Sequence, residues 1–200
     1  MLWATKFEYL IRFGIINRKK LSHINDANYF LLALDPTIIS NKYLMFHIIL
    51  FEPQIPPNTG NIIRLSANTG TELHLIEPLG FRLDEKSCRR AGLDYFAIAN
   101  VHIHKSLDVC IESVGAIRLF AITSRGKHSL FDIQLEAGDA FLFGSETSGL
   151  PNNVHNQFTE SKKLHLPMIA KNRSLNLANA ASIVVYEAWR QTGFINAGKK

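Results

Sequence analysis

The chain has 200 residues, of which 46% are hydrophobic and 20% charged, and this composition is ordinary for one globular domain with a substantial core. Its two cysteines, Cys88 and Cys110, form no CxxC pair, which argues against a disulfide framework and favours a reducing compartment, the cytoplasm. No apolar run reaches the length of a spanning helix, about 18 residues, so no membrane partner is expected. The formal net charge of +5 is compatible with a nucleic-acid partner.

Residues 1–44 have a poor secondary-structure pattern that predicts a short helix and tether at most. An apolar stretch precedes the basic cluster Arg18-Lys19-Lys20, which is the reverse of the order in a secretory signal. The segment is expected to lie outside the working domain, with Met45 as a candidate for the true initiator; the alternative is an appended RNA-contacting arm. The expected boundary separates an N-terminal extension, 1–44, from a domain over 45–200.

From Met45 onward, short apolar runs alternate with amphipathic segments, a pattern typical of an α/β domain. Strands are predicted over 45–51, 72–76, 98–103, 117–122, 139–143 and 163–166. Helices are predicted between Asn58 and Gly70 and over 85–91, 105–114, 151–157 and 175–192. The expected fold is therefore a mainly parallel sheet flanked by helices.

Two of these helices are defined more closely by their residues. Asn58 is a suitable N-cap for the first helix, and Gly70 is a suitable end. In the last helix, apolar or small residues recur at spacings of three and four, at Leu175, Ala178, Ser182, Val185 and Trp189. This spacing predicts one continuous face, buried against the sheet or against a partner.

Three segments combine Gly, Pro or Asn with charged groups just beyond predicted strands, where open α/β sheets place their ligands. They cover 52–64, 143–151 and 164–180. In the first, Arg64 extends from the early helical turns as a fixed cation, although most arginines are simply solvated. In the second, Glu146 lies between two glycines and is well placed to orient a cation or a hydroxyl, unless the segment is only a tight turn.

The third segment has two interpretations, and several familiar motifs are missing from the chain. Backbone groups after a strand, together with helix N-terminal amides, make a polar cradle at Ser174, but Ser174 is equally suited to be the N-cap. His102 and His104 share one strand face, yet two ligands make a poor metal site and no third is indicated, so no metal is predicted. The motifs GxSxG, GxGxxG and GxxxxGK[ST] are absent, which disfavours triad hydrolases, nicotinamide dehydrogenases and P-loop NTPases.

Four stretches, taken together, resemble the landmarks of the SPOUT (trefoil-knot) RNA methyltransferases. The similarity is greatest to the tRNA (cytidine/uridine wobble 2′-O)-methyltransferase family. The stretches are LFEPQIPPNTGNIIRL at 50–65, RRAGLDY at 89–95, RSLNLANA at 173–180 and VYEAWRQ at 185–191. In this order and spacing they span about residues 45–193, and the joint pattern is highly specific.

The resemblance implies a C-terminal trefoil knot, a rare exception to the rule that chains do not thread their loops. It also implies a homodimer with cofactor pockets beside the subunit interface, S-adenosyl-L-methionine as methyl donor, and tRNA as substrate. Residues matching the family's cofactor contacts, or neighbouring them, are Ile122, Gly144, Leu166, Met168, Ser174 and Leu175. Such residues hold adenosine by backbone hydrogen bonds and apolar packing.

The same resemblance implies catalytic and RNA-binding roles. Arg64 matches the arginine that activates the ribose 2′-hydroxyl, reaching across the dimer. Because arginine is normally protonated, orientation and electrostatic stabilisation describe its role better than proton abstraction. Glu146 and Asn176 are expected to hold neighbouring groups in place. The residues expected to meet the tRNA are Arg89, Arg90 and Tyr186.

The sequence departs from the family pattern at three positions. Ser145 stands where relatives often have Pro, Ser148 where Arg is common, and Ala178 where Ser is frequent. These changes are expected to alter RNA contacts more than cofactor binding. Two rival interpretations to a wobble-nucleotide enzyme stay open: a 2′-O-methyltransferase of the same class acting on another tRNA or ribosomal RNA site, and a non-catalytic RNA-binding knot protein.

Overall fold

A computed structural model describes residues 46–82, 100–115, 118–170, 172 and 174–198 of the chain. Within them, seven parallel strands form one sheet in the order β3-β2-β1-β6-β4-β7-β5. Their bounds are β1 His47–Phe51, β2 Glu72–Ile76, β3 Val101–His104, β4 Leu119–Ile122, β5 His128–Ser129, β6 Ala140–Phe143 and β7 Lys163–His165. The expectation of an α/β fold with a parallel sheet is confirmed. The two-residue strand β5 was not predicted, because it is too short to show a period.

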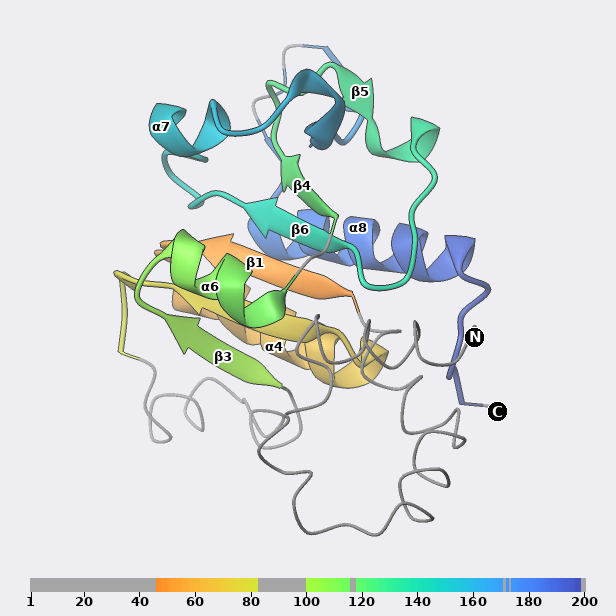
Figure 1. The fold of residues 1–200 in the computed structure, drawn as a ribbon, viewed down its shortest axis with the longest axis horizontal. Coiled ribbons are helices and arrows are strands. Elements are labelled where there is room, and N and C mark those ends of the chain that lie inside the picture. The colour runs from red at the N-terminus through yellow and green to blue at the C-terminus, as the bar shows by residue number, and fades with distance from the viewer. Residues whose placement is uncertain (1–45, 83–99, 116–117, 171, 173, 199–200) are drawn as a thin grey trace, which may run out of the picture.

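The helices cover both faces of the sheet, as Figure 1 shows. The described α-helices are α4 Pro56–Thr69, α6 Leu107–Val114, α7 Asn152–His155 and α8 Leu177–Gln191, with 3-10 turns η2 Leu130–Asp132 and η3 Glu160–Lys162. Helices α4 and α8 pack side by side on one face, and α6 lies on the other. The predicted helix over 85–91 lies outside the described residues. None of the described helices has the length and apolar character needed to cross a bilayer.

The strands bury side chains on both faces, which explains their continuous apolar sequences. Ile48 and Leu50 of β1 join the core beneath α4 and α8. Ile49, between them, joins a second core with Leu107 and Cys110 of α6. This burial fixes the register of the central strands, because a shift by one residue would exchange the two faces.

The start of α4 differs from the prediction. Asn58 is not the N-cap: the helix begins at Pro56, and its N-cap Ile55 makes no side-chain hydrogen bond to the helix. Two successive prolines have the φ value that the first helical turn requires, so they start the helix earlier. Gly70 ends the helix as predicted, in a left-handed conformation with φ of 71°.

The last helix, α8, begins two residues later than predicted. Its N-cap is Asn176, whose side-chain oxygen accepts from the backbone nitrogens of Ala178 at 2.9 Å and Asn179 at 3.2 Å. Ser174 is therefore not the N-cap. The buried face consists of Leu177, Ala178, Ala181, Val184, Val185 and Ala188, so only Ala178 and Val185 of the predicted face are fully buried. The buried face of α8 is therefore rotated about the helix axis relative to the predicted face. Helix α8 packs against α4 as well as against the sheet.

Candidate functional site

A cleft of about 810 Å³ lies at the carboxyl ends of β4, β6 and β7. Ile122 ends β4, Phe143 ends β6 and Leu166 follows β7, and all three line it. Because β6, β4 and β7 are neighbours in the sheet, segments distant in the sequence meet at one edge, where open α/β sheets place ligands. The volume is typical of a site for a small molecule or cofactor.

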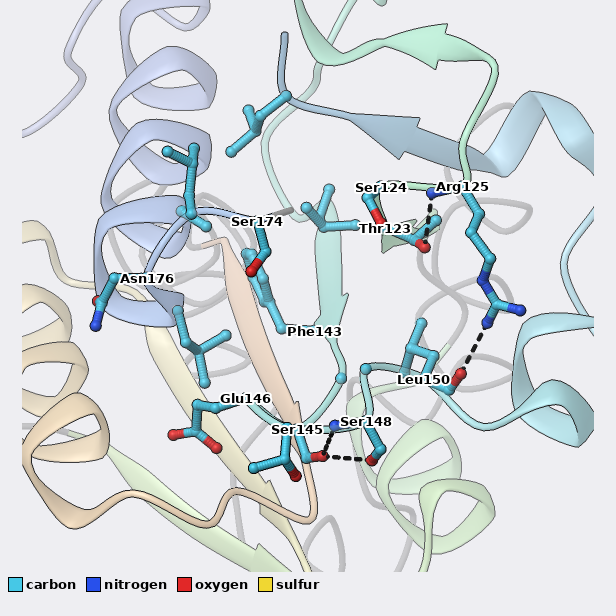
Figure 2. Close-up of a pocket in the computed structure, with 18 of the residues that line it drawn as sticks. Thr123, Ser124, Arg125, Phe143, Ser145, Glu146, Ser148, Leu150, Ser174 and Asn176 are labelled. Carbon is cyan, nitrogen blue, oxygen red and sulfur yellow. Dashed lines mark hydrogen bonds between the residues drawn. The ribbon is translucent and has the colours of Figure 1, made fainter. Parts of the chain in front are cut away.

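The cleft contains most of the side chains singled out from the sequence. All six predicted cofactor contacts line it: Ile122, Gly144, Leu166, Met168, Ser174 and Leu175. Two predicted catalytic residues, Glu146 and Asn176, line it as well. Figure 2 shows Ser174 and Asn176 on the side facing α8, across the cleft from Arg125. The walls combine aliphatic side chains with a few polar groups, as is typical of sites for small molecules.

Gly144 allows the loop after β6 to fold closely on itself. Ser145 and Gly149 form an antiparallel bridge, with the Gly149 nitrogen donating to the Ser145 carbonyl at 2.9 Å. A Cβ added at Gly144 would overlap the backbone of Gly149 and Leu150. Only glycine fits this close approach, so the residue shapes the cleft floor through its missing side chain.

Glu146 connects the loop after β6 to the first predicted segment. Its carboxylate accepts hydrogen bonds from the backbone nitrogens of Gln54 at 2.8 Å and Ile55 at 3.2 Å. It also accepts from Asn58 Nδ2 at 3.0 Å. These bonds to an ionised acceptor are stronger than neutral ones, and they fix where the chain enters α4.

Asn58 extends this connection to the third segment. Asn176 Nδ2 donates to Asn58 Oδ1 at 2.8 Å, while Asn176 Oδ1 caps α8. The sequence analysis took Asn58 for a helix N-cap and did not place its side chain in the site. The chain of contacts from Glu146 through Asn58 to Asn176 therefore holds the three segments together.

Replacing Glu146 with alanine should lower the free energy of unfolding by about 1.5 kcal/mol, the lower end for hydrogen bonds to charged groups, because water can reach the exposed donors. Chemical denaturation followed by circular dichroism would measure this change. Glu112→Ala is a matched control, since Glu112 is an exposed carboxylate on α6. Equal stability of both variants would show that the carboxylate does not secure the loop.

Arg125 is a cleft residue that the sequence reasoning missed. It lies in the loop after β4 and donates from Nη2 to the Leu150 carbonyl at 2.8 Å and from Nη1 to Asn152 Oδ1 at 2.8 Å. Figure 2 shows this side chain lying along the cleft wall. The sequence did contain a signal for this residue. The polar segment Thr123-Ser-Arg-Gly126 directly follows a strand, which was the criterion that selected the other three segments.

The other predicted site residues lie outside the cleft or outside the described residues. Arg64 is exposed on α4 and does not line the cleft of its own chain. It follows Asn58 by six residues, or about 9 Å along the helix. Tyr186 is exposed on α8 and packs edge-on against Trp189 with ring centroids 5.8 Å apart. Arg89 and Arg90 lie outside the described residues.

Two of the three departures from the family pattern interact with each other. Ser145 Oγ lies 2.8 Å from Ser148 Oγ, and the Ser148 nitrogen donates to Ser145 Oγ at 3.4 Å. The pair closes the turn from within, as Figure 2 shows. Ala178 is buried in α8. Their effect on RNA contacts stays a prediction.

The expectation that no metal is bound stays a prediction. His102 and His104 do lie on one face of β3, but further ligand types lie beside them on β1 and β2. His47, Glu72 and His74 bring three potential ligand atoms within 4.8 Å of one another. The sequence did not show this grouping, because the strand register joins residues that are distant along the chain.

Comparison with known sequences identifies a family match. Residues 45–186 match the model of the SpoU rRNA Methylase family. A protein from Methylovorus glucosotrophus named tRNA (cytidine(34)-2′-O)-methyltransferase is 51% identical over 153 residues, which are 76% of this chain and 99% of that protein. The match thus spans the described cleft and the sheet that supports it.

Solved structures agree with this match. One, concerned with the 2-OH methylation of C/U34 on tRNA, is 42% identical to this chain and has a TM-score of 0.70. The matched region is 75% of this chain and 97% of that structure's chain. Another is the SpoU methyltransferase AviRb from Streptomyces viridochromogenes in complex with AdoMet, which is 27% identical to this chain and has a TM-score of 0.65. The matched region is 75% of this chain and 58% of the AviRb chain. Because the family model matches residues 45–186 and a relative is 51% identical over 153 residues, this chain belongs to the SpoU methylase family.

Proposed function

We propose that this chain transfers a methyl group from S-adenosyl-L-methionine to the ribose 2′-oxygen of the pyrimidine nucleotide at the wobble position of tRNA. The observation that carries the proposal is the likeness to the Methylovorus protein named for this reaction, which extends over 99% of that protein. The cleft at the carboxyl edge of the sheet supplies a site of suitable size. The expectation from the four sequence stretches points to the same reaction.

The cleft suits the adenosine part of the methyl donor. Ile122, Leu166 and Leu175 provide apolar walls, and the loop backbone around Gly144 and Ser174 provides hydrogen-bonding groups. Met168 lies at the same wall. When bound, S-adenosyl-L-methionine supplies a methyl group on a positively charged sulfur. No metal is part of the proposal, since the transferred group is already activated by that charge.

The chain's own residues must assist the ribose hydroxyl, which is a weak acid. Arg64 carries this role in the proposal: its guanidinium orients the hydroxyl and stabilises the negative charge that develops on oxygen. A protonated guanidinium is a poor base, so the proton of the ribose 2′-hydroxyl passes to an acceptor other than Arg64, such as solvent water. Glu146 and Asn176 act as positioning residues, because they hold the start of α4 and the start of α8 against the cleft.

A homodimer would bring Arg64 of one subunit to the cleft of the other. The position of Arg64 outside its own cleft supports this arrangement. Large exposed apolar side chains near the cleft also support it, namely Ile55, Leu175, Ile183 and Tyr186, because such groups are typical of interfaces. Tyr186 is equally suited to meet tRNA, as are Arg89 and Arg90.

The finer architecture follows from the family. We infer that the C-terminal part forms a trefoil knot, since β7 lies between β4 and β5 in the sheet and the chain then returns to pack α8 beside α4. Residues 1–44 precede the family match, which begins at residue 45, and are assigned to a separate extension. The cytoplasm is the proposed location, because tRNA is modified there.

Nucleoside mass spectrometry of tRNA should show loss of the 2′-O-methylated wobble pyrimidine in cells that lack this gene, and recovery when the gene is restored. Restoring residues 45–200 alone tests whether the extension contributes. An unchanged tRNA profile with a missing methyl group in ribosomal RNA would favour the second candidate function, 2′-O-methylation of ribosomal RNA. The name of the matched family model, SpoU rRNA Methylase, supports that candidate. Unchanged tRNA and ribosomal RNA would favour a non-catalytic RNA-binding protein.

A further inference from the structure

A group of imidazoles and one carboxylate lies on the α6 face of the sheet, apart from the cleft. The register pairs His47 with Glu72, and His74 with His102. Because paired residues of parallel strands point to the same face, these four side chains stand together across β1, β2 and β3. His47 and Glu72 begin their strands, whereas the cleft lies at the carboxyl ends of β4, β6 and β7.

The spacing of the ligand atoms fits a tetrahedral metal ion. His47 Nδ1 lies 3.1 Å from His74 Nε2. Glu72 Oε2 lies 3.8 Å from the first of these nitrogens and 3.9 Å from the second. Ligand atoms bound to one zinc ion at about 2.0 to 2.2 Å stand about 3.3 to 3.6 Å apart. Small side-chain rotations therefore bring all three atoms to bonding distance of one ion.

We propose that His47, Glu72 and His74 bind a divalent transition-metal ion, with zinc the best fit to two imidazoles and a carboxylate. His102 is the candidate for the fourth ligand. Its Nε2 lies 3.6 Å from the same Glu72 oxygen, and its side chain is 47% exposed, so it has room to turn toward the ion. Water takes that position if His102 does not.

His104 has the position of a supporting residue for this site. Its Nε2 lies 3.0 Å from His74 Nδ1, the ring nitrogen that faces away from His47. Metal-bound histidines almost always donate their second ring N–H to such a partner, which fixes the tautomer and the ring orientation. With His104 as acceptor, His74 keeps its Nε2 lone pair for the metal.

The charge state of the group also suits a cation. Burial is the main cause that lowers the pKa of His74, to about 3, and it lowers the pKa values of His47 and His104 too. Within the described ranges, the groups in ion-pair range of the Glu72 carboxylate are imidazoles.

A second set of ligand types, His74, His104 and Cys110, is less suited to bind the ion. Burial raises the pKa of the Cys110 thiol to about 12, so the protonated form is held among the apolar side chains under α6. A metal at His47, Glu72 and His74 would instead bind β1 to β2 near the sheet edge and, through His102, would include β3.

The test is metal binding by the full-length chain without a purification tag, after treatment with a chelator. Titration with Zn²⁺ should show one bound equivalent, and Co²⁺ should give the intense visible absorption of a tetrahedral site. Glu72→Gln removes the charged ligand at nearly constant shape and should weaken Zn²⁺ binding about 100-fold. His104→Phe should weaken it about 10- to 100-fold, as loss of such supporting contacts does.

His128→Gln is the matched control, because His128 is an exposed histidine on β5, away from the cluster, and it should bind Zn²⁺ like the unchanged chain. Far-ultraviolet circular dichroism identifies variants that do not fold. If Glu72→Gln fails to fold, His47→Gln, which removes another of the three proposed ligands, replaces it in the titration. Absence of binding by the unchanged chain, or equal binding by folded Glu72→Gln and the control, would overturn the proposal and leave a metal-free imidazole cluster.

Discussion

Replacing Arg64 with alanine should reduce methyl transfer to tRNA about 100- to 1,000-fold, while the affinity for S-adenosyl-L-methionine stays the same. This reduction in rate is the size expected from the loss of one group that stabilises developing negative charge. The affinity should be unchanged because Arg64 lies outside the cleft that is proposed to bind the donor. Single-turnover kinetics with purified tRNA, together with calorimetry of donor binding, would measure both quantities.

Two further variants define the role of the guanidinium. Arg64→Lys keeps the charge but loses the planar, two-pronged donor geometry, so it should recover only part of the lost rate. Lys105→Ala removes an equal charge at an exposed position outside the cleft and should leave turnover near that of the unchanged enzyme. Full activity of Arg64→Ala would exclude this residue from the chemistry.

The same variant tests whether Arg64 acts across the proposed dimer. A chain with Arg64→Ala has an intact cleft, and a chain with Gly144→Ala has an intact Arg64. If the arginine serves the partner's cleft, co-expressed chains that pair at random should recover about a quarter of the full turnover, since half of the dimers carry one complete site. If Arg64 serves its own cleft, the mixture should be as inactive as either variant alone.

Replacing Gly144 with alanine should abolish donor binding in the cleft, with the dissociation constant raised more than about 100-fold. The added methyl group would overlap the backbone of Gly149 and Leu150, and closely packed backbone has no room to move aside without losing the bridge between Ser145 and Gly149. Because Gly144 is on the cleft wall, the loop would move where the donor must lie. Calorimetry with S-adenosyl-L-methionine measures the effect.

Gly198→Ala provides the control for that experiment. A Cβ at Gly198 would meet no atom within 4 Å, so this variant should bind the donor as the unchanged chain does. Thermal unfolding of both variants separates a local change in the loop from general instability. Donor binding by Gly144→Ala at full affinity would show that the cleft does not depend on the tight turn.

The sequence predicted the sheet well because buried parallel strands have distinct apolar runs. The runs that contain His47–Phe51, Glu72–Ile76 and Ala140–Phe143 were recognised within two residues at each end. Helix boundaries were less accurate, since Pro56 and Asn176 act through conformation and capping, and several nearby residues were equally suitable on sequence grounds.

The cleft residues were predicted mainly because each stands directly after a strand or in a family landmark. What sequence reasoning did not find were contacts between segments. Asn58 was taken for a helix cap, yet its amide joins Glu146 to Asn176. His102 and His104 were dismissed for want of a third ligand, yet β2 places His74 beside them. Both cases depend on strand register and loop closure, which one-dimensional patterns do not record.

The contact between Glu146 and Asn58 has a consequence for how the enzyme would sense its substrates. Asn58 belongs to the same helix as Arg64, so α4 acts as a lever between the cleft proposed for the donor and Arg64, which is proposed to meet the ribose. A displacement of the loop after β6 on donor binding would be transmitted along this lever. In the proposed dimer, loading of the donor in one subunit would thereby set the readiness of its partner to accept RNA.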